Sequence, residues 1–261
     1  ISQMDYMEVF KKFGYAYGQQ ESYSLNHIAY VVLGEEKLSY EEHGSLNNLY
    51  KADLQKFIDY NIKDVELVDR FEDKMGLITL AMTMAYRGGV NYSDTFGTTA
   101  IWDSIIYRIL NQRKVAIPQK REKPKGDYAG GYVKEPQVGR HEWIVSFDLN
   151  SLYPNLIVQY NMSPETLTDN TQMNDVSYYL SGQTVNGEYS VAANGSSYRK
   201  DFDGVLPQII EEYYDERVSV KKMQLAAQKE IQKTFSPELG KEIVTLENKQ
   251  LAIKILLNSL Y

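Results

Sequence analysis

The stretch Trp143-Ile-Val-Ser-Phe-Asp-Leu149, followed at once by Asn150-Ser-Leu-Tyr-Pro154, decides how the chain is interpreted. Its first part alternates along the chain, which predicts a β-strand with side chains on two opposite faces. In that strand, the side chain of Asp148 would point to the face opposite the most apolar one. Pro154 suits the first turn of a helix, so the N–H groups just before it lie near a helix start and can meet an anion. The segment therefore predicts a place for a metal ion and a triphosphate, although an ordinary strand-to-helix connection with one solvated acid has the same pattern.

The longer string Ser146-Phe-Asp-Leu-Asn-Ser-Leu-Tyr-Pro-Asn-Leu-Ile157 resembles the first polymerase motif of family B DNA polymerases, Asp-x-x-Ser-Leu-Tyr-Pro-Ser-Ile-Ile. The resemblance implies that Asp148 and the carbonyl of Leu149 bind two Mg²⁺ ions, or Mn²⁺ in their place. It also implies that the backbone amides of Ser151 and Leu152 hold the nucleotide phosphates. The ring of Tyr153 would exclude a ribose 2′-hydroxyl. Asn155-Leu156 departs from the usual Ser-Ile, past the reacting atoms.

Composition indicates a folded protein with room for more than one domain. The chain has 261 residues, of which 43% are hydrophobic and 24% are charged, whereas domains typically hold about 100–200 residues. No apolar run approaches the ~20 residues of a membrane helix, so no membrane partner is expected. The absence of cysteine excludes disulfides and fits a cytoplasmic location, and the three scattered histidines make a zinc site unexpected. Both ends of the chain read as cut.

The net charge of −7 does not exclude nucleic acid as a partner, because a groove responds to the charges that line it. Between Arg108 and Lys125 there are seven basic residues and one acid, which makes this stretch a candidate for phosphate contacts. A solvated surface linker is the alternative. Pro118 and Pro124 favour such an extended connector.

Four blocks of different pattern indicate an α+β protein with several domains. Residues 1–77 show a helical beginning, a polar middle and a strong helix from about Leu49 to Met75. Residues 78–118 are mainly helical, residues 119–204 predict strands and turns, and residues 205–261 predict two long helices. The dipeptides Asn186-Gly and Asn194-Gly in the third block are typical of hairpin turns.

By resemblance, the same four blocks correspond in order to parts of a polymerase. They are the C-terminal part of a ribonuclease H-like exonuclease domain (1–77), a helical connecting or N-terminal region (78–118), the N-terminal part of the palm with its antiparallel sheet (119–204), and a truncated two-helix fingers hairpin (205–261).

Tyr60 and Asp64 lie four residues apart in the predicted early helix, so a phenol and a carboxylate share one face. A surface pair is the plainer interpretation. Their place upstream of the polymerase motif resembles the third exonuclease motif, in which Asp64 would bind a metal and Tyr60 would orient the attacking water. The earlier exonuclease motifs do not occur, so this chain alone is not expected to proofread.

The string Tyr128-Ala-Gly-Gly131 carries paired glycines, which let a backbone approach another chain closely. A simple turn is the alternative. The string resembles the Tyr-x-Gly-Gly element between the exonuclease and polymerase regions of the family. The resemblance implies template-strand contacts for three residues: Tyr128, Gly130 and Gly131.

The two C-terminal helices separate a packing face from a polar one. Arg217 and Lys221 lie four apart and can grip a polyanion together. In the last helix, spacings of three and four predict a packing stripe with Gln250 as its one polar member: Ile243, Leu246, Gln250, Ile253, Leu257 and Leu260. Roughly a quarter turn away, a second face holds Lys254, Asn258 and Tyr261. A helical hairpin with solvated cations is the alternative.

Leu206-Pro-Gln-Ile-Ile, Arg217-x-x-x-Lys221 and Lys254-Ile-Leu-Leu-Asn-Ser-Leu-Tyr261 resemble the fingers of family B polymerases. The resemblance implies that the basic residues hold the triphosphate, that Asn258 lies near the nucleotide and that Tyr261 approaches the nascent base pair. The overall pattern is closest to the replicative polymerases of tailed bacteriophages. The Asp-Thr-Asp motif with the second catalytic aspartate and the thumb do not occur, and one carboxylate is too few to fix two metal ions.

The predicted function is template-directed DNA synthesis, in which a primer 3′-hydroxyl takes dNMP from a dNTP by two-metal phosphoryl transfer, in an enzyme that also proofreads. This chain is expected to be inactive alone, as a truncated piece or as part of a split enzyme completed by a complementary polymerase chain. Expected partners are primer–template DNA, dNTP and, by resemblance, a sliding clamp and other replisome proteins in a host cytoplasm. A non-catalytic nucleic-acid-binding subunit and a structural remnant are the alternatives.

Overall fold

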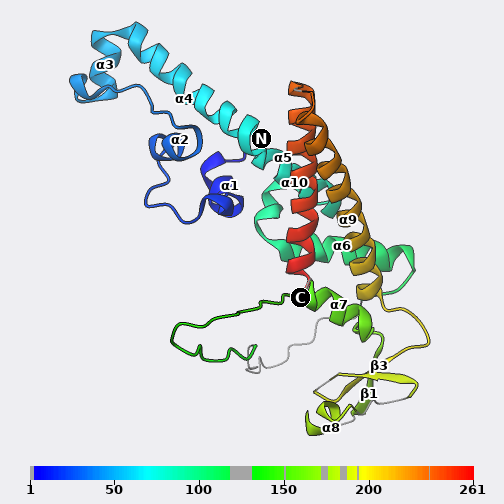
Figure 1. Cartoon of the computed structure of the whole chain (residues 1–261). Helices are drawn as coiled ribbons and strands as arrows, with labels where there is room; N and C mark the ends of the chain where they lie inside the picture. Colours follow the sequence, from blue (N-terminus) through cyan, green and yellow to red (C-terminus); the bar gives the residue numbers. More distant parts are fainter. Residues whose placement is uncertain are drawn as a thin grey trace. The chain divides into compact units, whose positions relative to one another are not determined.

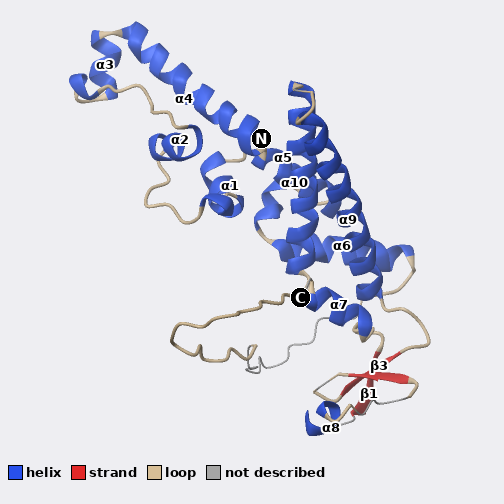
Figure 2. Cartoon of the chain, viewed as in Figure 1, coloured by secondary structure: helices blue, strands red, loops and turns tan. Residues whose placement is uncertain are grey.

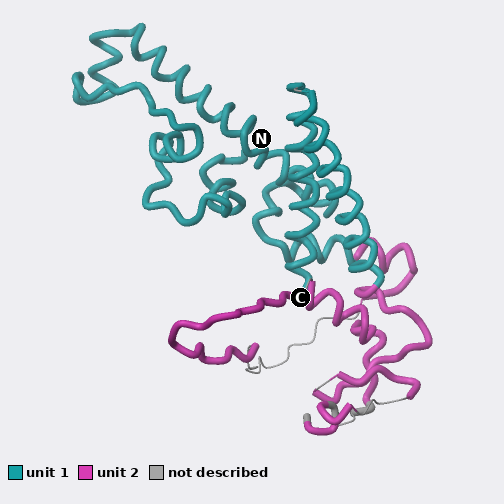
Figure 3. The backbone as a smooth tube through the Cα atoms, viewed as in Figure 1, with its two compact units in different colours: residues 1–106, 208–261 teal, residues 107–207 magenta. Residues whose placement is uncertain are grey.

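The computed structural model describes residues 3–117, 131–149, 151–171, 176–182, 187–192, 194–234 and 236–261. These residues are mostly helical, with one small antiparallel sheet (Figure 1, Figure 2). The chain divides into two compact units, one made of residues 1–106 and 208–261 and the other of residues 107–207 (Figure 3). None of the helices in the described ranges is long and apolar enough to cross a bilayer.

The N-terminal helices of the first unit begin at capping side chains. The elements are α1 (Tyr6–Phe13), the 3₁₀ turn η1 (Tyr15–Tyr17) and α2 (Leu25–Leu33). At the start of α1, the side chain of Asp5 accepts a hydrogen bond from the N–H of Met7 at 2.8 Å. At the start of α2, the hydroxyl of Ser24 accepts one from the N–H of His27 at 3.4 Å. Such caps satisfy backbone donors that a helix start leaves without partners.

The long helix predicted from Leu49 to Met75 is interrupted once. The structure has two helices here, α3 (Leu46–Ala52) and α4 (Leu54–Met75). They separate at Asp53, whose φ of −145° is not helical and whose side chain accepts a hydrogen bond from the N–H of Lys56 at 2.9 Å. Aspartate is among the preferred N-cap residues, so it starts a new helix where apolar spacing alone predicts continuation.

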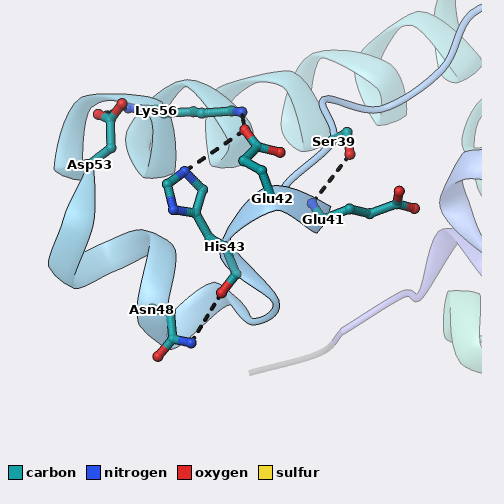
Figure 4. Close-up of polar contacts among 7 residues, drawn as sticks. All are labelled: Ser39, Glu41, Glu42, His43, Asn48, Asp53 and Lys56. Atoms are coloured by element: carbon teal, nitrogen blue, oxygen red, sulfur yellow. Dashed lines mark hydrogen bonds and ion pairs between the residues drawn. The ribbon is translucent and has the colours of Figure 1, made fainter.

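The polar segment between α2 and α3 is tied to the start of α4 by surface contacts (Figure 4). It contains the 3₁₀ turn η2 (Glu41–His43), in which Glu42 forms an ion pair with Lys56 of α4. Asn48 of α3 donates a hydrogen bond from Nδ2 to the carbonyl of His43 at 3.0 Å. Exposed ion pairs stabilise a fold little, so these contacts guide the path of the segment more than they stabilise it.

The core of the first unit lies around α5 (Leu77–Gly88), which α10 (Pro237–Ser259) covers. The fully buried side chains include Leu80 and Met84 of α5 and Ile253 and Leu256 of α10. The helical pattern predicted for residues 78–118 is confirmed in α5 and in α6 (Thr98–Gln112), which the 3₁₀ helix η3 (Tyr92–Phe96) precedes. Burial of these apolar side chains supplies the main stabilising term of the unit.

The predicted pair of C-terminal helices is confirmed as α9 (Val205–Ile231) and α10, which lie side by side (Figure 1). The break between them ends at Ser236, whose hydroxyl accepts a hydrogen bond from the N–H of Leu239 at 3.3 Å, and Pro237 takes the first helical position. Serine followed by proline is a typical helix start. The two helices form an antiparallel hairpin.

The second unit contains α7 (Leu152–Gln159), α8 (Val176–Leu180) and the sheet. Its strands β1 (Leu167–Thr171), β2 (Tyr189–Val191) and β3 (Ser196–Arg199) are ordered β1-β3-β2, and all pairs are antiparallel. The Asn194-Gly195 turn joins β2 to β3, with Gly195 at a φ of 85° and a hydrogen bond from the N–H of Ser196 to Asn194 Oδ1 at 3.0 Å. This predicted hairpin turn is confirmed, whereas Asn186 lies outside the described residues.

The predicted strand over residues 143–149 is wrong for this structure. These residues have no regular secondary structure, Trp143 has a left-handed φ of 58°, and Trp143 and Phe147 are 97% and 92% exposed. An alternating segment becomes a strand only when a neighbouring strand supplies hydrogen bonds, and no described residue supplies them here. Alternation in the sequence therefore indicates the capacity for a strand rather than its formation in this chain.

Candidate functional sites

The segment that carries the first polymerase motif turns sharply into α7. Ser151 precedes the helix in a left-handed conformation, with φ 52° and ψ 47°, and its carbonyl accepts a hydrogen bond from the N–H of Asn155 at 3.1 Å. Pro154 lies in the first turn, as predicted, and is buried. The backbone N–H groups of Leu152 and Tyr153 stand in that same first turn, where a helix leaves donors open to an anion.

Asp148 and the residues after it are open to solvent. Within the described residues, Asp148 takes part in no hydrogen bond and no ion pair, and its side chain is exposed. Leu149 is also exposed, and Tyr153 is 58% exposed. The described residues contain no group of three or more His, Cys, Asp or Glu that could hold a metal ion. Asp148 can therefore serve as one ligand of a cation, but it needs further ligands.

One hydrogen bond relates the basic residues of α9 to those of α10. Arg217 Nε donates to Gln250 Oε1 at 3.2 Å. Lys221 lies one turn after Arg217 on α9, and Lys254 lies one turn after Gln250 and about 40° further round α10. Because the helices are antiparallel, helical spacing predicts a row of three backbone positions with Arg217 in the middle, at intervals of about 6 Å along the helix axes.

The end of α10 is held by an indole that the sequence analysis did not single out. Trp102 of α6 is buried, and its Nε1 donates to the carbonyl of Leu256 at 3.2 Å and to Ser259 Oγ at 3.0 Å. The next residues form the predicted polar face, since Tyr261 Oη donates to Asn258 Oδ1 at 3.1 Å. The indole therefore fixes the turn from which Asn258 and Tyr261 project.

A second group missed by sequence reasoning joins α5, α9 and α10. The guanidinium of Arg87 donates two hydrogen bonds to the carboxylate of Glu216, at 2.8 and 2.5 Å, and its Cζ lies 4.8 Å from the ring centre of Tyr213. Lys249 Nζ lies 3.5 Å from the same carboxylate. The hydrogen bonds from Arg87 hold the pKa of Glu216 below its usual range, although partial burial opposes them.

The predicted exonuclease pair is joined by a lysine that also went unrecognised. Tyr60 is buried, and Lys37 Nζ lies 4.7 Å from its ring centre and 2.8 Å from Asp64 Oδ2. Burial lowers the pKa of Lys37, but its hydrogen bonds to Asp64 and Tyr60 outweigh that effect and raise the pKa overall. Asp64 Oδ1 is buried and has no hydrogen-bond partner among the residues that the structure describes. An oxygen left in this state fits a cation or water ligand.

Several predicted contacts fall wholly or partly outside the described residues. Tyr128 and Gly130 lie outside them, while Gly131 is described and exposed. The basic stretch is described only up to residue 117, which includes Arg108 and Arg113. The predicted nucleic-acid contacts in this region remain predictions.

Comparison with known proteins places these features in a family. Residues 97–261 match the model of DNA polymerase family B. The DNA-directed DNA polymerase of Escherichia phage RB69 is 36% identical over 231 residues, which cover 88% of this chain and 25% of that protein. The enzyme of Enterobacteria phage T4 is 34% identical over 228 residues, with 87% and 25% covered. The DNA polymerase of Thermococcus gorgonarius is 38% identical over 147 residues, with 55% and 16% covered.

The chain therefore belongs to DNA polymerase family B, as the motifs predict. It spans about a quarter of the length of the two phage relatives.

Proposed function

We propose that this chain contributes the triphosphate-binding helices and the first palm motif of a polymerase that adds dNMP from dNTP to a primer 3′-hydroxyl on a DNA template. The observation that carries this proposal is the hydrogen bond from Arg217 to Gln250. It sets Arg217 of α9 against α10 about one helical turn from Lys254, which supports a row of cations of the kind that a triphosphate requires. The domain assignments predicted above are part of the same proposal.

Arg217, Lys221 and Lys254 would bind the phosphates and neutralise the charge that grows on the departing pyrophosphate. Within the described residues, none of these three side chains pairs with a carboxylate, so their charges are not already compensated. Asn258 and Tyr261 would approach the nucleotide and the nascent base pair. Side chains placed before the reaction cost no reorganisation as charge develops.

On the palm side, the exposed carboxylate of Asp148 and the carbonyl of Leu149 would be ligands of Mg²⁺, together with ligands beyond those described. Two bound Mg²⁺ ions would supply stabilisation of the attacking and leaving oxygens. The first-turn amides of α7 would bind phosphate oxygens, and the exposed ring of Tyr153 would exclude a ribose 2′-hydroxyl. In an enzyme completed by the rest of the palm, Tyr153→Ala should therefore admit ribonucleotides.

The group of Lys37, Tyr60 and Asp64 supports a proofreading role in the whole enzyme. Asp64 Oδ1 is available to a cation, Tyr60 is fixed against Lys37, and Lys37 holds the other oxygen of the same carboxylate. Tyr60 would orient the attacking water. Because the other exonuclease carboxylates do not occur in the sequence, the 3′–5′ reaction requires residues from outside this chain.

Binding of dATP to this chain, measured by calorimetry with and without Mg²⁺, tests the proposal. Arg217→Ala and Lys254→Ala should each weaken Mg²⁺-dependent binding by roughly tenfold or more, the scale expected for a charged hydrogen bond. Lys241→Ala, which removes an exposed lysine near the start of the same helix α10, is the matched control. Equal, weak binding by all three variants and the parent chain would favour a non-catalytic nucleic-acid-binding role.

Activity needs a second experiment with the missing region supplied. Primer extension should be absent with this chain alone and should appear when a complementary chain with Asp-Thr-Asp and a thumb is added. Binding of a clamp and of other replisome proteins, which the resemblance implies as partners, would then be measured with the complemented enzyme.

A further inference from the structure

The contact between Arg87 and Glu216 lies directly beside the row of cations on α9 and α10. Glu216 precedes Arg217 in the sequence, and the two side chains are about 100° apart around α9. Glu216 faces Arg87 and Lys249, whereas Arg217 faces Gln250. A carboxylate and the guanidinium that the proposed function assigns to phosphate thus project from adjacent positions of α9, about 100° apart.

Glu216 is the acid that matters for this row. Asp215, the other acid next to it, lies about 200° around the helix from Arg217 and is exposed. An uncompensated carboxylate on the side of α10 would repel a triphosphate that Arg217 binds. A group that holds the Glu216 carboxylate in place and neutralises its charge would therefore favour triphosphate binding.

Arg87 neutralises the Glu216 carboxylate and is itself held in place by its surroundings. Its side chain is only 16% exposed, it holds both oxygens of Glu216, and it stacks over Tyr213. The ring of Tyr213 in turn packs against Trp102, with ring centres 5.9 Å apart. A bidentate, stacked guanidinium gives both charge compensation and a defined direction.

We propose that Arg87 is a positioning residue for triphosphate binding: it holds the Glu216 carboxylate on the α5 side of α9 and keeps this negative charge away from phosphates bound by Arg217. The proposal rests on the proposed function, because it presupposes that the row of cations binds a triphosphate. It gives α5 a role in nucleotide affinity although α5 carries no phosphate contact of its own.

The test compares variants that break the same ion pair with opposite changes in charge. Binding of Mg²⁺–dATP and of inorganic tripolyphosphate to the full chain is measured by calorimetry. Arg87→Met should weaken both by about fivefold, as expected of one unit charge across a partly screened site. Glu216→Gln should leave both unchanged or tighter. The double variant should return to the affinity of the parent chain, and Arg87→Lys should retain most of it.

A purely structural contact predicts a different pattern, in which both single variants weaken binding because both break the ion pair. That result would overturn the proposal, as would a double variant no better than Arg87→Met. Thermal unfolding of each variant checks that it folds. About 1 M salt should shrink the difference between the single variants, since screening then acts within about 3 Å.

A matched ion pair elsewhere in the same unit controls for net charge. Glu35 is held by Arg70 and Lys63, as Glu216 is held by Arg87 and Lys249, but it belongs to neither α9 nor α10. Arg70→Met should leave triphosphate affinity unchanged. If the parent chain binds no triphosphate at all, the proposed function fails. If it binds and Arg217→Ala weakens it while Arg87→Met does not, only the role of Arg87 fails.

Discussion

Replacing Glu165 with alanine should loosen the first turn of α9. Glu165 Oε1 accepts a hydrogen bond from the N–H of Val205 at 2.5 Å, and Ser163 Oγ donates to its other oxygen at 2.7 Å. Ser163 Oγ also accepts one from the N–H of Leu206 at 3.4 Å. The two side chains together satisfy donors that the start of α9 leaves open, although they lie about 40 residues earlier in the sequence.

The size of the effect follows from the two interactions that are lost. A hydrogen bond to a charged group contributes about 1.5–3 kcal/mol, and a carboxylate near a helix N-terminus about 0.3–1 kcal/mol. Glu165 is exposed at the surface, so solvent screening favours the lower end. We expect about 2 kcal/mol for Glu165→Ala and about 1 kcal/mol for Glu165→Gln, which keeps an acceptor oxygen.

Hydrogen exchange of the amides at the start of α9 measures this effect where it arises. Two kcal/mol corresponds to about 30-fold faster exchange for an amide that opens locally. The control is Glu211→Ala, which removes an exposed carboxylate from α9 without breaking a hydrogen bond or ion pair within the described residues. If the Val205 and Leu206 amides exchange equally fast in both variants, Glu165 does not act as the cap.

Three further predictions concern the first unit. Gly76→Ala should destabilise the unit by about 2 kcal/mol or more, because a Cβ there would meet Asn248 Nδ2 at 2.2 Å and φ is 61°. Gly34→Ala is the control: Gly34 has a similar left-handed backbone with a φ of 73° but nothing within 4 Å of the added Cβ, so this change should cost about 1 kcal/mol. Urea unfolding compares the two variants. Trp102→Phe removes an N–H from its two acceptors in α10 and should cost about 1–2 kcal/mol in the same assay. The pKa of Glu216 is lowered in the folded chain. The carboxylate therefore stabilises the fold fully above the unfolded pKa of about 4.3, and this contribution is lost as pH falls through the lower folded pKa. The difference in unfolding free energy between the parent chain and Glu216→Gln should shrink between pH 6 and pH 3.

Features that depend on neighbours in the sequence could be predicted. Apolar spacing, a capping serine and Pro237 are enough to predict α10, and Asn194-Gly195 is enough to predict the hairpin turn. Asp53 shows the limit of this reasoning: apolar periodicity continues through it, and only the side-chain cap observed in the structure identifies it as a helix start. A stricter search for Asp before a helical repeat could have found it.

Contacts between distant segments could not be predicted from one sequence. Arg87 and Glu216 are 129 residues apart, and neither lies in a motif, so nothing local marks them as partners. The same holds for Lys37, which lies in a polar segment without periodicity but reaches Asp64. Strand formation over 143–149 fails for a related reason, because a strand depends on a partner that the segment itself does not specify.

Polar residues on a packing face are the exception, because their position alone predicts a partner. A polar group in a helix interface must be hydrogen-bonded or it destabilises the fold. Gln250, the polar member of the predicted stripe, meets this requirement through Arg217. Asn248 lies outside the predicted stripe, but the structure buries it, and it donates to the carbonyl of Gly76 at 3.1 Å. Two polar positions on α10 thus set its register against α9 and against the α4–α5 junction. Substituting either residue by leucine would keep an apolar packing face but remove a hydrogen bond that sets the register of α10. Lys254 would then be less well placed relative to Arg217. Nucleotide affinity should therefore fall in both leucine variants, although neither position is proposed to contact the phosphates.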